Sequence, residues 1–103
     1  MSVRVIAFVT IDETQPLALA QYLEATGPLL ESAGATIVQR FRLNEVVVGN
    51  KPSQSVIIVD YPSLAAVDLV FASQAYQYII PSRDKAFLDY HVTVVSGEEQ
   101  AEQ

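Results

Sequence analysis

The sequence predicts an α+β fold whose elements follow the order β-α-β-β-α-β. Three observations lead to this prediction. Short runs rich in Val and Ile recur along the chain, two segments between them repeat apolar residues at helical spacing, and Gly, Pro or acidic residues separate the runs. The length of 103 residues fits one domain. This order defines the ferredoxin-like arrangement, a four-stranded antiparallel sheet with helices on one face.

The first strand and the first helix have clear signals. Residues 3–11 are mostly β-branched and apolar, which predicts a strand. A helix is predicted over residues 15–32, with Pro16 in its first turn. Its apolar positions recur at helical spacing: Leu19, Tyr22, Leu23 and Leu30. Gly27-Pro28 lies inside this segment and is expected to disturb the helix, because proline lacks a backbone donor.

The middle of the chain predicts two strands joined by a turn. Residues 35–48 are expected to be the second strand, a long one with a bend near Asn44. Residues 49–53, GNKPS, have the composition of a turn. Residues 56–61 are expected to form the third strand, after which Ser63 caps a second helix. The apolar face of that helix consists of Leu64, Val67, Val70 and Phe71.

The last third of the chain completes the fold. Residues 76–80 are expected to add a turn, and Pro81 to restart a short helix that ends near residue 88. Residues 89–95 then form the fourth strand. We therefore expect residues 1–97 to be a single domain and residues 98–103 to be a disordered acidic tail.

The strands carry apolar residues on both faces. In the first strand, Val5 and Val9 share one face, whereas Ile6 and Phe8 lie on the other. Helices can cover only one face of the sheet, so the other face needs a different cover. A second copy of the same sheet is the simplest cover. The pattern therefore predicts a homodimer packed sheet to sheet, with a barrel between the subunits.

An acid interrupts the third strand, VIIVDYPS. Strand parity places Asp60 on a mixed face together with Arg40, Arg42 and His91. An enclosed carboxylate needs a partner. One interpretation is a structural ion pair of Asp60 with Arg40 or Arg42, a second is a polar cluster in a ligand pocket, and a third is an acid at a wet, open end. A bulge in the second strand would reverse the facing of Arg42 and Asn44.

Three other residues are candidates for a pocket. His91 is the only histidine, and it suits either acid–base chemistry or a structural hydrogen bond. Tyr22 either lines a pocket between helices and sheet or belongs to the core. Arg83 is either a surface or capping arginine or a fixed cation that reaches an acid. The ligand-pocket candidates are therefore Asp60, Arg40, His91, Arg83 and Tyr22.

Composition disfavours several classes of function. The net charge is −6 and the basic residues are scattered, which disfavours nucleic acids and anionic membranes as partners. The chain has no cysteine, and its single histidine is poor material for a metal site. No phosphate loop or nucleophile motif is present, so no cofactor is expected. There is no signal-peptide pattern and no apolar run near ~18 residues, so we expect a cytoplasmic protein.

The chain resembles the domain-of-unknown-function 1330 (DUF1330) family over roughly residues 4–97. The strongest part of the resemblance is the stretch Phe71–Gln77, FASQAYQ. The other residues that carry it are Asp12, Tyr22, Pro28–Leu30, Ala33–Gly34, Val48–Gly49, Val59–Ser63, Arg83 and Val94–Gly97. The resemblance implies a dimeric α/β barrel and a homodimer.

The chain also departs from the usual pattern of this family. Ala33 replaces a glycine, Val48 and Asp60 replace glutamates, and Val70 replaces a tryptophan. The resemblance implies no reaction, because the wider superfamily includes cofactor-independent monooxygenases, haem-degrading enzymes, lactone isomerases and binding modules. The haem-degrading type relies on a tryptophan, and this chain has none.

Two functional hypotheses follow. The first is a homodimeric small-molecule-binding protein, extending to a cofactor-independent enzyme that acts on a small organic acid or aromatic compound. The second is a non-catalytic dimeric accessory or protein-interaction module. A pocket of roughly 300 Å³ or more with convergent polar groups would favour the first hypothesis.

Overall fold

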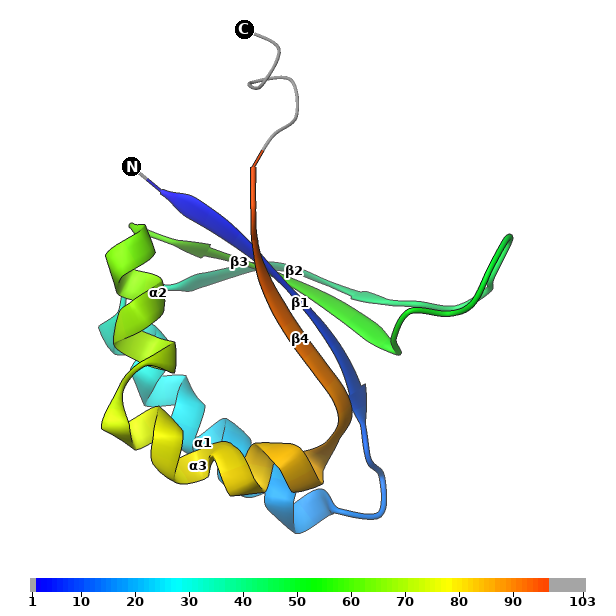
Figure 1. Ribbon diagram of the computed structural model, residues 1–103, viewed down its shortest axis with the longest axis horizontal. Helices are drawn as coiled ribbons and strands as arrows, with labels where there is room; N and C mark the ends of the chain where they lie inside the picture. The colour runs from blue at the N-terminus through cyan, green and yellow to red at the C-terminus, as the bar shows by residue number, and fades with distance from the viewer. Residues whose placement is uncertain (1, 97–103) are drawn as a thin grey trace, which may run out of the picture.

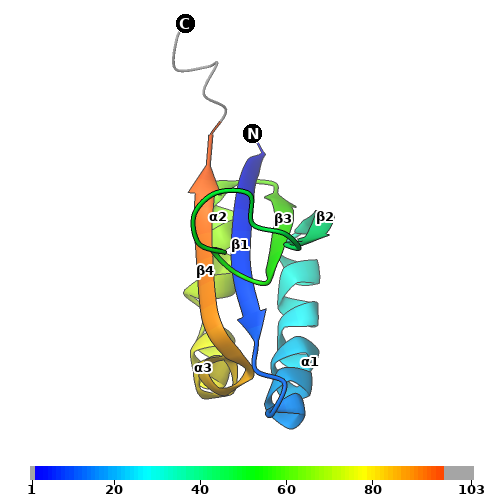
Figure 2. The same ribbon diagram turned by 90° about the vertical axis from the view of Figure 1, so that its right-hand side faces the viewer.

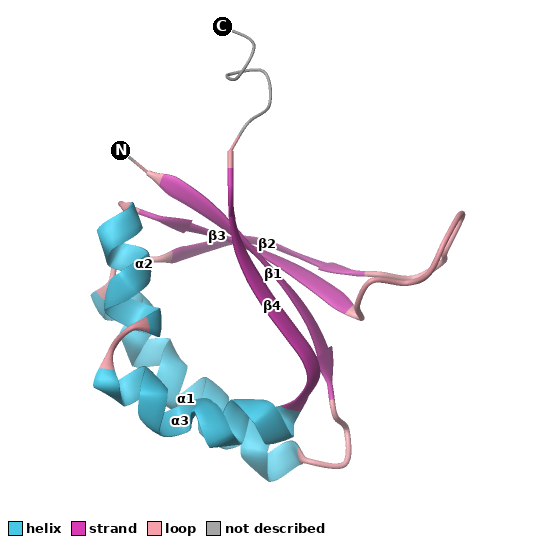
Figure 3. Cartoon of the chain, viewed as in Figure 1, coloured by secondary structure: helices cyan, strands magenta, loops and turns pink. Residues whose placement is uncertain are grey.

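The computed structural model describes residues 2–96, which form seven elements in the order β-α-β-β-α-α-β (Figure 1, Figure 3). Their bounds are β1 Val3–Ile11, α1 Pro16–Ser32, β2 Thr36–Arg42, β3 Ser55–Tyr61, α2 Leu64–Phe71, α3 Gln74–Ala86 and β4 Phe87–Val95. The predicted order is confirmed, with the second helical region divided into α2 and α3. The expected acidic tail lies outside the described residues.

The strands form one four-stranded sheet in the order β2-β3-β1-β4, and all neighbouring strands are antiparallel. The three helices lie on one face of this sheet, with α3 alongside β4 and α1 on the side of β2 and β3 (Figure 1, Figure 2). This confirms the ferredoxin-like fold class. We call the helix-facing side, which carries Val5, Ala7 and Val9 of β1, the inner face and the opposite side the outer face.

The second strand is much shorter than predicted. It ends at Arg42, and residues 43–54 instead form an arm that projects beyond the sheet (Figure 1). A backbone hydrogen bond of 2.8 Å from Leu43 N to Gln54 O closes the base of the arm. Gly49 has φ +87°, a conformation that L-residues with side chains rarely adopt, which suits the tip of a turn.

Neither internal proline breaks its helix, so the disturbance predicted at Pro28 and the new helix start predicted at Pro81 are both wrong. The helices α1 and α3 run through these positions. Proline frees the carbonyl of the residue four positions earlier, here Glu24 or Gln77. All of these residues are exposed, so water can hydrogen-bond the freed carbonyls.

Two serines define the starts of α2 and α3. Ser63 Oγ accepts a hydrogen bond of 3.1 Å from Ala66 N, which confirms the predicted cap. Ser73 Oγ accepts one of the same length from Tyr76 N. The second cap starts α3 directly after α2 and fixes the helical turn that carries Tyr76.

The core lies where the helices pack on the inner face. Its largest fully buried side chains are Val5, Val70 and Tyr76. Within residues 2–96, no helix combines the length and the apolar character that crossing a membrane requires.

Candidate functional site

A cavity of about 580 Å³ lies between the inner face and the helices. Its floor is apolar and comes from the central strands and β4: Val5, Ala7, Val9, Ile57, Val59 and Val92. The helices contribute Leu19, Leu23, Leu30, Val70 and Phe71 to the opposite wall. The cavity is therefore a space bounded mainly by hydrocarbon, with a few polar side chains among its lining residues.

A bulge in β2 brings two arginines to this cavity. The register between β2 and β3 shifts between Ile37 and Gln39, so Val38 is an extra residue. Beyond it, Arg40 pairs with Ile57 and Arg42 pairs with Ser55 on the inner face. Simple alternation had placed both arginines beside Asp60. The inserted residue turns their side chains to the other face.

The mouth of the cavity lies between β2 and α1. The lining residues that are solvent-exposed belong to these two elements: Leu23, Ile37, Arg40, Phe41 and Arg42. The strand β2 is an edge strand, so no further strand covers this side. Among the described residues that line the cavity, Arg40 and Arg42 are the charged ones, and none is acidic.

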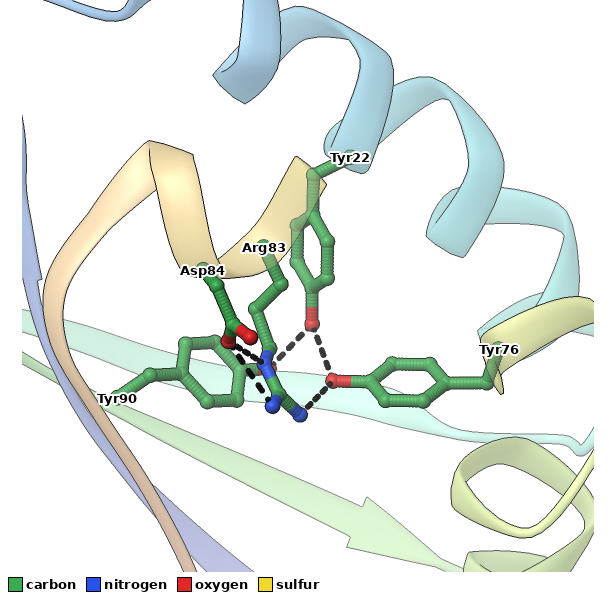
Figure 4. A network of polar contacts seen from close by, with 5 residues as sticks. All are labelled: Tyr22, Tyr76, Arg83, Asp84 and Tyr90. Carbon is green, nitrogen blue, oxygen red and sulfur yellow. Dashed lines mark hydrogen bonds and ion pairs between the residues drawn. The ribbon is translucent and has the colours of Figure 1, made fainter. Parts of the chain in front are cut away.

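Three tyrosines meet at the closed end of the cavity (Figure 4). The hydroxyl of Tyr22 on α1 lies 2.9 Å from the hydroxyl of Tyr76 on α3 and 2.5 Å from that of Tyr90 on β4. The ring of Tyr22 meets the other two edge to face, at centroid distances of 6.1 and 5.8 Å. We call these residues the tyrosine cluster.

Arg83 on α3 packs against the tyrosine cluster (Figure 4). Its Nη1 donates a hydrogen bond of 3.4 Å to Tyr76 Oη. The guanidinium carbon lies 5.8 Å from the ring centroid of Tyr76 and 5.5 Å from that of Tyr90, which allows cation–π attraction to both. Arg83 also donates to Asp84, at 3.2 and 3.1 Å. The guanidinium is thus held in place by five contacts.

Burial keeps the phenols of this region protonated. It raises the pKa of Tyr22 and of Tyr90 above the ordinary value, because the phenolate would lose its hydration. The same cause raises the pKa of Tyr61, which also lines the cavity, to about 12. At neutral pH these hydroxyls are therefore available as hydrogen-bond donors.

The structure separates the five predicted pocket residues into two groups. Tyr22 and Arg40 line the cavity, and Arg83 contacts the tyrosine cluster at its closed end. Asp60 and His91 lie on the outer face, because they share register positions with Arg4 and Phe8 respectively.

Asp60 has a different partner from those expected. Arg4, directly opposite on β1, donates hydrogen bonds of 2.8 and 3.0 Å to its two carboxylate oxygens. These bonds lower the pKa of Asp60. The predicted ion pair with Arg40 or Arg42 is wrong, because the bulge turns those two side chains to the inner face, whereas Arg4 lies directly opposite Asp60 on the outer face.

His91 does not join Asp60 in this chain. It is exposed and pairs with Phe8, four positions along β1 from Arg4, which faces Asp60. Within residues 2–96, no group of three or more His, Asp and Glu side chains is arranged to hold a metal ion.

Sequence reasoning missed Tyr90 as a member of the site. The sequence does indicate its position, because side chains alternate along a strand and Tyr90 therefore shares the apolar face of β4 with Val92 and Val94. A phenol on an otherwise aliphatic face places a hydroxyl inside the fold, where it needs a partner.

The chain belongs to the family described as "Domain of unknown function (DUF1330)", whose profile matches residues 4–98. This confirms the resemblance. A search of curated proteins finds no match.

Several solved structures share the fold. The RPA0582 protein of Rhodopseudomonas palustris, a protein of unknown function, has a TM-score of 0.76 at 20% identity, with 93% of this chain and 82% of that chain covered. A dimeric ferredoxin-like protein of unknown function from Thermobifida fusca has a TM-score of 0.55 at 11% identity, covering 94% and 92%. A protein of Caulobacter crescentus, described as a candidate antibiotic biosynthesis monooxygenase, has a TM-score of 0.64 at 8% identity, covering 93% and 89%.

Proposed function

We propose that this protein binds a small, largely apolar molecule in the cavity between the inner face and the helices. The observation that carries the proposal is the cavity of about 580 Å³ with converging hydroxyl groups at its closed end. Ligand pockets usually span roughly 300 to 1,000 Å³ and combine apolar walls with a few polar groups. A purely structural accessory module would not need such a space, so the cavity favours the ligand-binding hypothesis over that alternative.

The size of the cavity supports a ligand rather than loose packing. Protein interiors pack at a density close to that of organic crystals and leave few voids larger than a water molecule. Each wall of this cavity forgoes dispersion contacts that a collapsed core would make. A bound apolar molecule restores those contacts and so stabilises the folded state.

We also propose that the chain forms a homodimer through the outer face. This face carries a contiguous apolar group: Ile6, Phe8, Val56 and Ile58. Such a group on a sheet surface usually marks an interface. The description of a structural neighbour as dimeric supports the same assignment. The Arg4–Asp60 pair then lies within or beside that interface.

The finer hypothesis of a cofactor-independent enzyme acting on a small organic acid or aromatic compound rests on the same cavity. The groups available for proton transfer at its closed end are the hydroxyls of the tyrosine cluster. The fold shared with a candidate monooxygenase supports this only as an analogy.

Binding can be tested with a neutral fluorescent probe, phenylnaphthylamine, whose emission rises in apolar surroundings. The wild type should bind it, and Ala7→Leu, which places a larger side chain on the cavity floor, should lose this binding. Ala65→Leu, at an exposed position of α2, is the matched control and should bind like the wild type. Equal binding by the wild type and Ala7→Leu, or no binding by the wild type, would contradict the proposed site.

The homodimer can be tested by analytical ultracentrifugation. We expect the wild type to sediment as a dimer and Phe8→Asp to sediment as a monomer, because a carboxylate would be buried unpaired at the interface. Tyr78→Asp, at a residue of α3 that is 86% exposed, should remain dimeric. A monomeric wild type would refute the assembly.

A further inference from the structure

We propose that the ligand is an organic anion with an apolar body, and that its anionic oxygens accept hydrogen bonds from the Tyr22–Tyr76–Tyr90 cluster. This inference rests on the proposed function, because it requires the cavity to be a binding site. It adds the chemical class of the ligand and the direction in which the ligand lies.

The first argument is a count of protons in the tyrosine cluster. The three hydroxyls carry three protons but make only two contacts with one another, at 2.9 and 2.5 Å. Each contact uses one proton, so one O–H is left over whichever way the bonds run. Arg83 contributes a further donor to Tyr76 and no acceptor. The cluster therefore has a surplus donor and lacks an acceptor.

The second argument is that the nearest polar groups do not supply this acceptor. Thr26, the other hydroxyl that α1 contributes to the cavity, bonds to the backbone of its own helix at Tyr22 O (2.9 Å), and within residues 2–96 no hydrogen bond joins its Oγ1 to a hydroxyl of the tyrosine cluster. The carboxylate of Asp84 accepts from Arg83, and its side chain is 65% exposed rather than turned into the cavity. An oxygen of a ligand would satisfy the surplus donor. The raised pKa values of Tyr22 and Tyr90 keep these groups protonated for that role.

The third argument is the sign of the charge around the cavity. The charged residues in its described lining are Arg40 and Arg42 at the mouth, and Arg83 lies behind the tyrosines at the other end. The whole chain has a net charge of −6, so this positive lining is a local feature. Arg40 and Arg42 attract an anion at the mouth, whereas the charge of Arg83 at the other end is shared with Asp84, and a cation finds no acidic side chain in the described lining.

The fourth argument fixes the orientation. Four residues lie side by side across the inner face, one on each strand, in the order Arg42, Ser55, Val9, Tyr90. Three interstrand spacings separate the first from the last, so the mouth and the tyrosine cluster lie at opposite edges of the sheet, about 14 Å apart. The floor between them is aliphatic. Arg83 is partly buried and held by Tyr76, Tyr90 and Asp84, whereas Arg40 and Arg42 are exposed and hydrated. The anionic group loses hydration at this end, and the surplus O–H of the cluster with the fixed guanidinium of Arg83 replaces that hydration by hydrogen bonds in a desolvated site, which places the anionic group at the tyrosines.

The test uses three probes with the same ring system: naphthoate, naphthamide and naphthylmethylamine. Isothermal titration calorimetry at neutral pH should show the tightest binding for naphthoate and the weakest for the amine. The triple variant Tyr22→Phe/Tyr76→Phe/Tyr90→Phe, which removes every hydroxyl of the cluster, should weaken naphthoate binding by roughly tenfold to a hundredfold, the loss expected for a hydrogen bond to a charged group. Far-UV circular dichroism that matches the wild type should show that the variant folds.

Matched controls come from the exposed side of α3. Tyr78→Phe removes a hydroxyl, and Lys85→Gln removes a positive charge, outside the cavity. Both should bind naphthoate like the wild type. As an independent measurement on the wild type, NMR of tyrosine labelled with carbon-13 should show naphthoate-induced shifts for Tyr22, Tyr76 and Tyr90 but not for Tyr78.

The outcomes separate this inference from the proposed function. If the amide or the amine binds as tightly as naphthoate, the inference is overturned while the cavity remains a binding site. Suppose instead that Arg40→Gln or Arg42→Gln removes the preference for naphthoate, while the tyrosine variant still prefers naphthoate. The anion then lies at the mouth, and the assignment to the tyrosine cluster is overturned. If neither the naphthalene series nor phenylnaphthylamine binds, the proposed function itself fails.

Discussion

The substitution Ala7→Leu tests the cavity through the sign of its effect on stability. Ala7 lies on β1 in the middle of the cavity floor and is 9% exposed. In a well-packed core, a larger side chain at such a position costs about 1–3 kcal/mol because neighbours must move. Next to a space of about 580 Å³, the added carbons enter that space without displacing a neighbour. The structure therefore predicts stabilisation where ordinary packing predicts destabilisation.

The magnitude follows from the apolar groups added. Leucine exceeds alanine by three carbons, and each buried methylene contributes about 0.8 kcal/mol. Ordering the leucine side chain costs about 0.5–1 kcal/mol of conformational entropy. The net expectation is an increase of about 1–2 kcal/mol in the free energy of unfolding. For a domain of this size, that corresponds to a rise in Tm of about 5–10 °C.

The assay is urea unfolding of ligand-free protein at one fixed concentration, because dimerisation would make the midpoint depend on concentration. Ala65→Leu on the exposed side of α2 should change stability by no more than about 0.5 kcal/mol. A fall in the urea midpoint for Ala7→Leu, with the slope unchanged, would mean that this part of the core is already full. The cavity and the function assigned to it would then be refuted together.

Three further outcomes are expected. Gly34→Ala should lower the free energy of unfolding by about 1–2 kcal/mol, because Gly34 has φ +76°, a conformation that disfavours a residue with a side chain. Thermal unfolding should show a lower Tm, and an unchanged Tm would mean that the turn after α1 relaxes. Ser73→Ala should cost about 1 kcal/mol through loss of the cap of α3, and urea unfolding that matches the wild type would contradict the cap. The pKa of Tyr61 is raised from 10.0 to about 12, so the contribution of this burial to stability is complete below pH 10 and is lost as the pH rises through about 12. In a pH titration followed by phenolate absorbance, Tyr61, Tyr22 and Tyr90 should ionise at higher pH than an exposed tyrosine. Ionisation of all tyrosines near pH 10 would contradict their burial.

Local sequence patterns were enough to predict the order of elements and the two-sided character of the strands. Both depend on local periodicity, such as the alternation within residues 3–11 and the helical spacing around Tyr22, which adjacent residues carry without reference to the rest of the chain. The cap at Ser63 was predicted for the same reason, because it joins residues only three positions apart. The helices that continue through both prolines were not predicted, because solvent exposure of the freed carbonyls depends on which side of each helix faces the sheet.

Only the tertiary structure decided the site. The single extra residue at Val38 turns Arg40 and Arg42 away from Asp60 and towards the cavity, and the register between β2 and β3 sets where that residue is inserted. The tyrosine cluster joins Tyr22 to residues 54 and 68 positions later in the chain. Local patterns carry no information about contacts at such separations. They form only when three elements pack together, and that packing fixes where the hydroxyls and the positive charges meet.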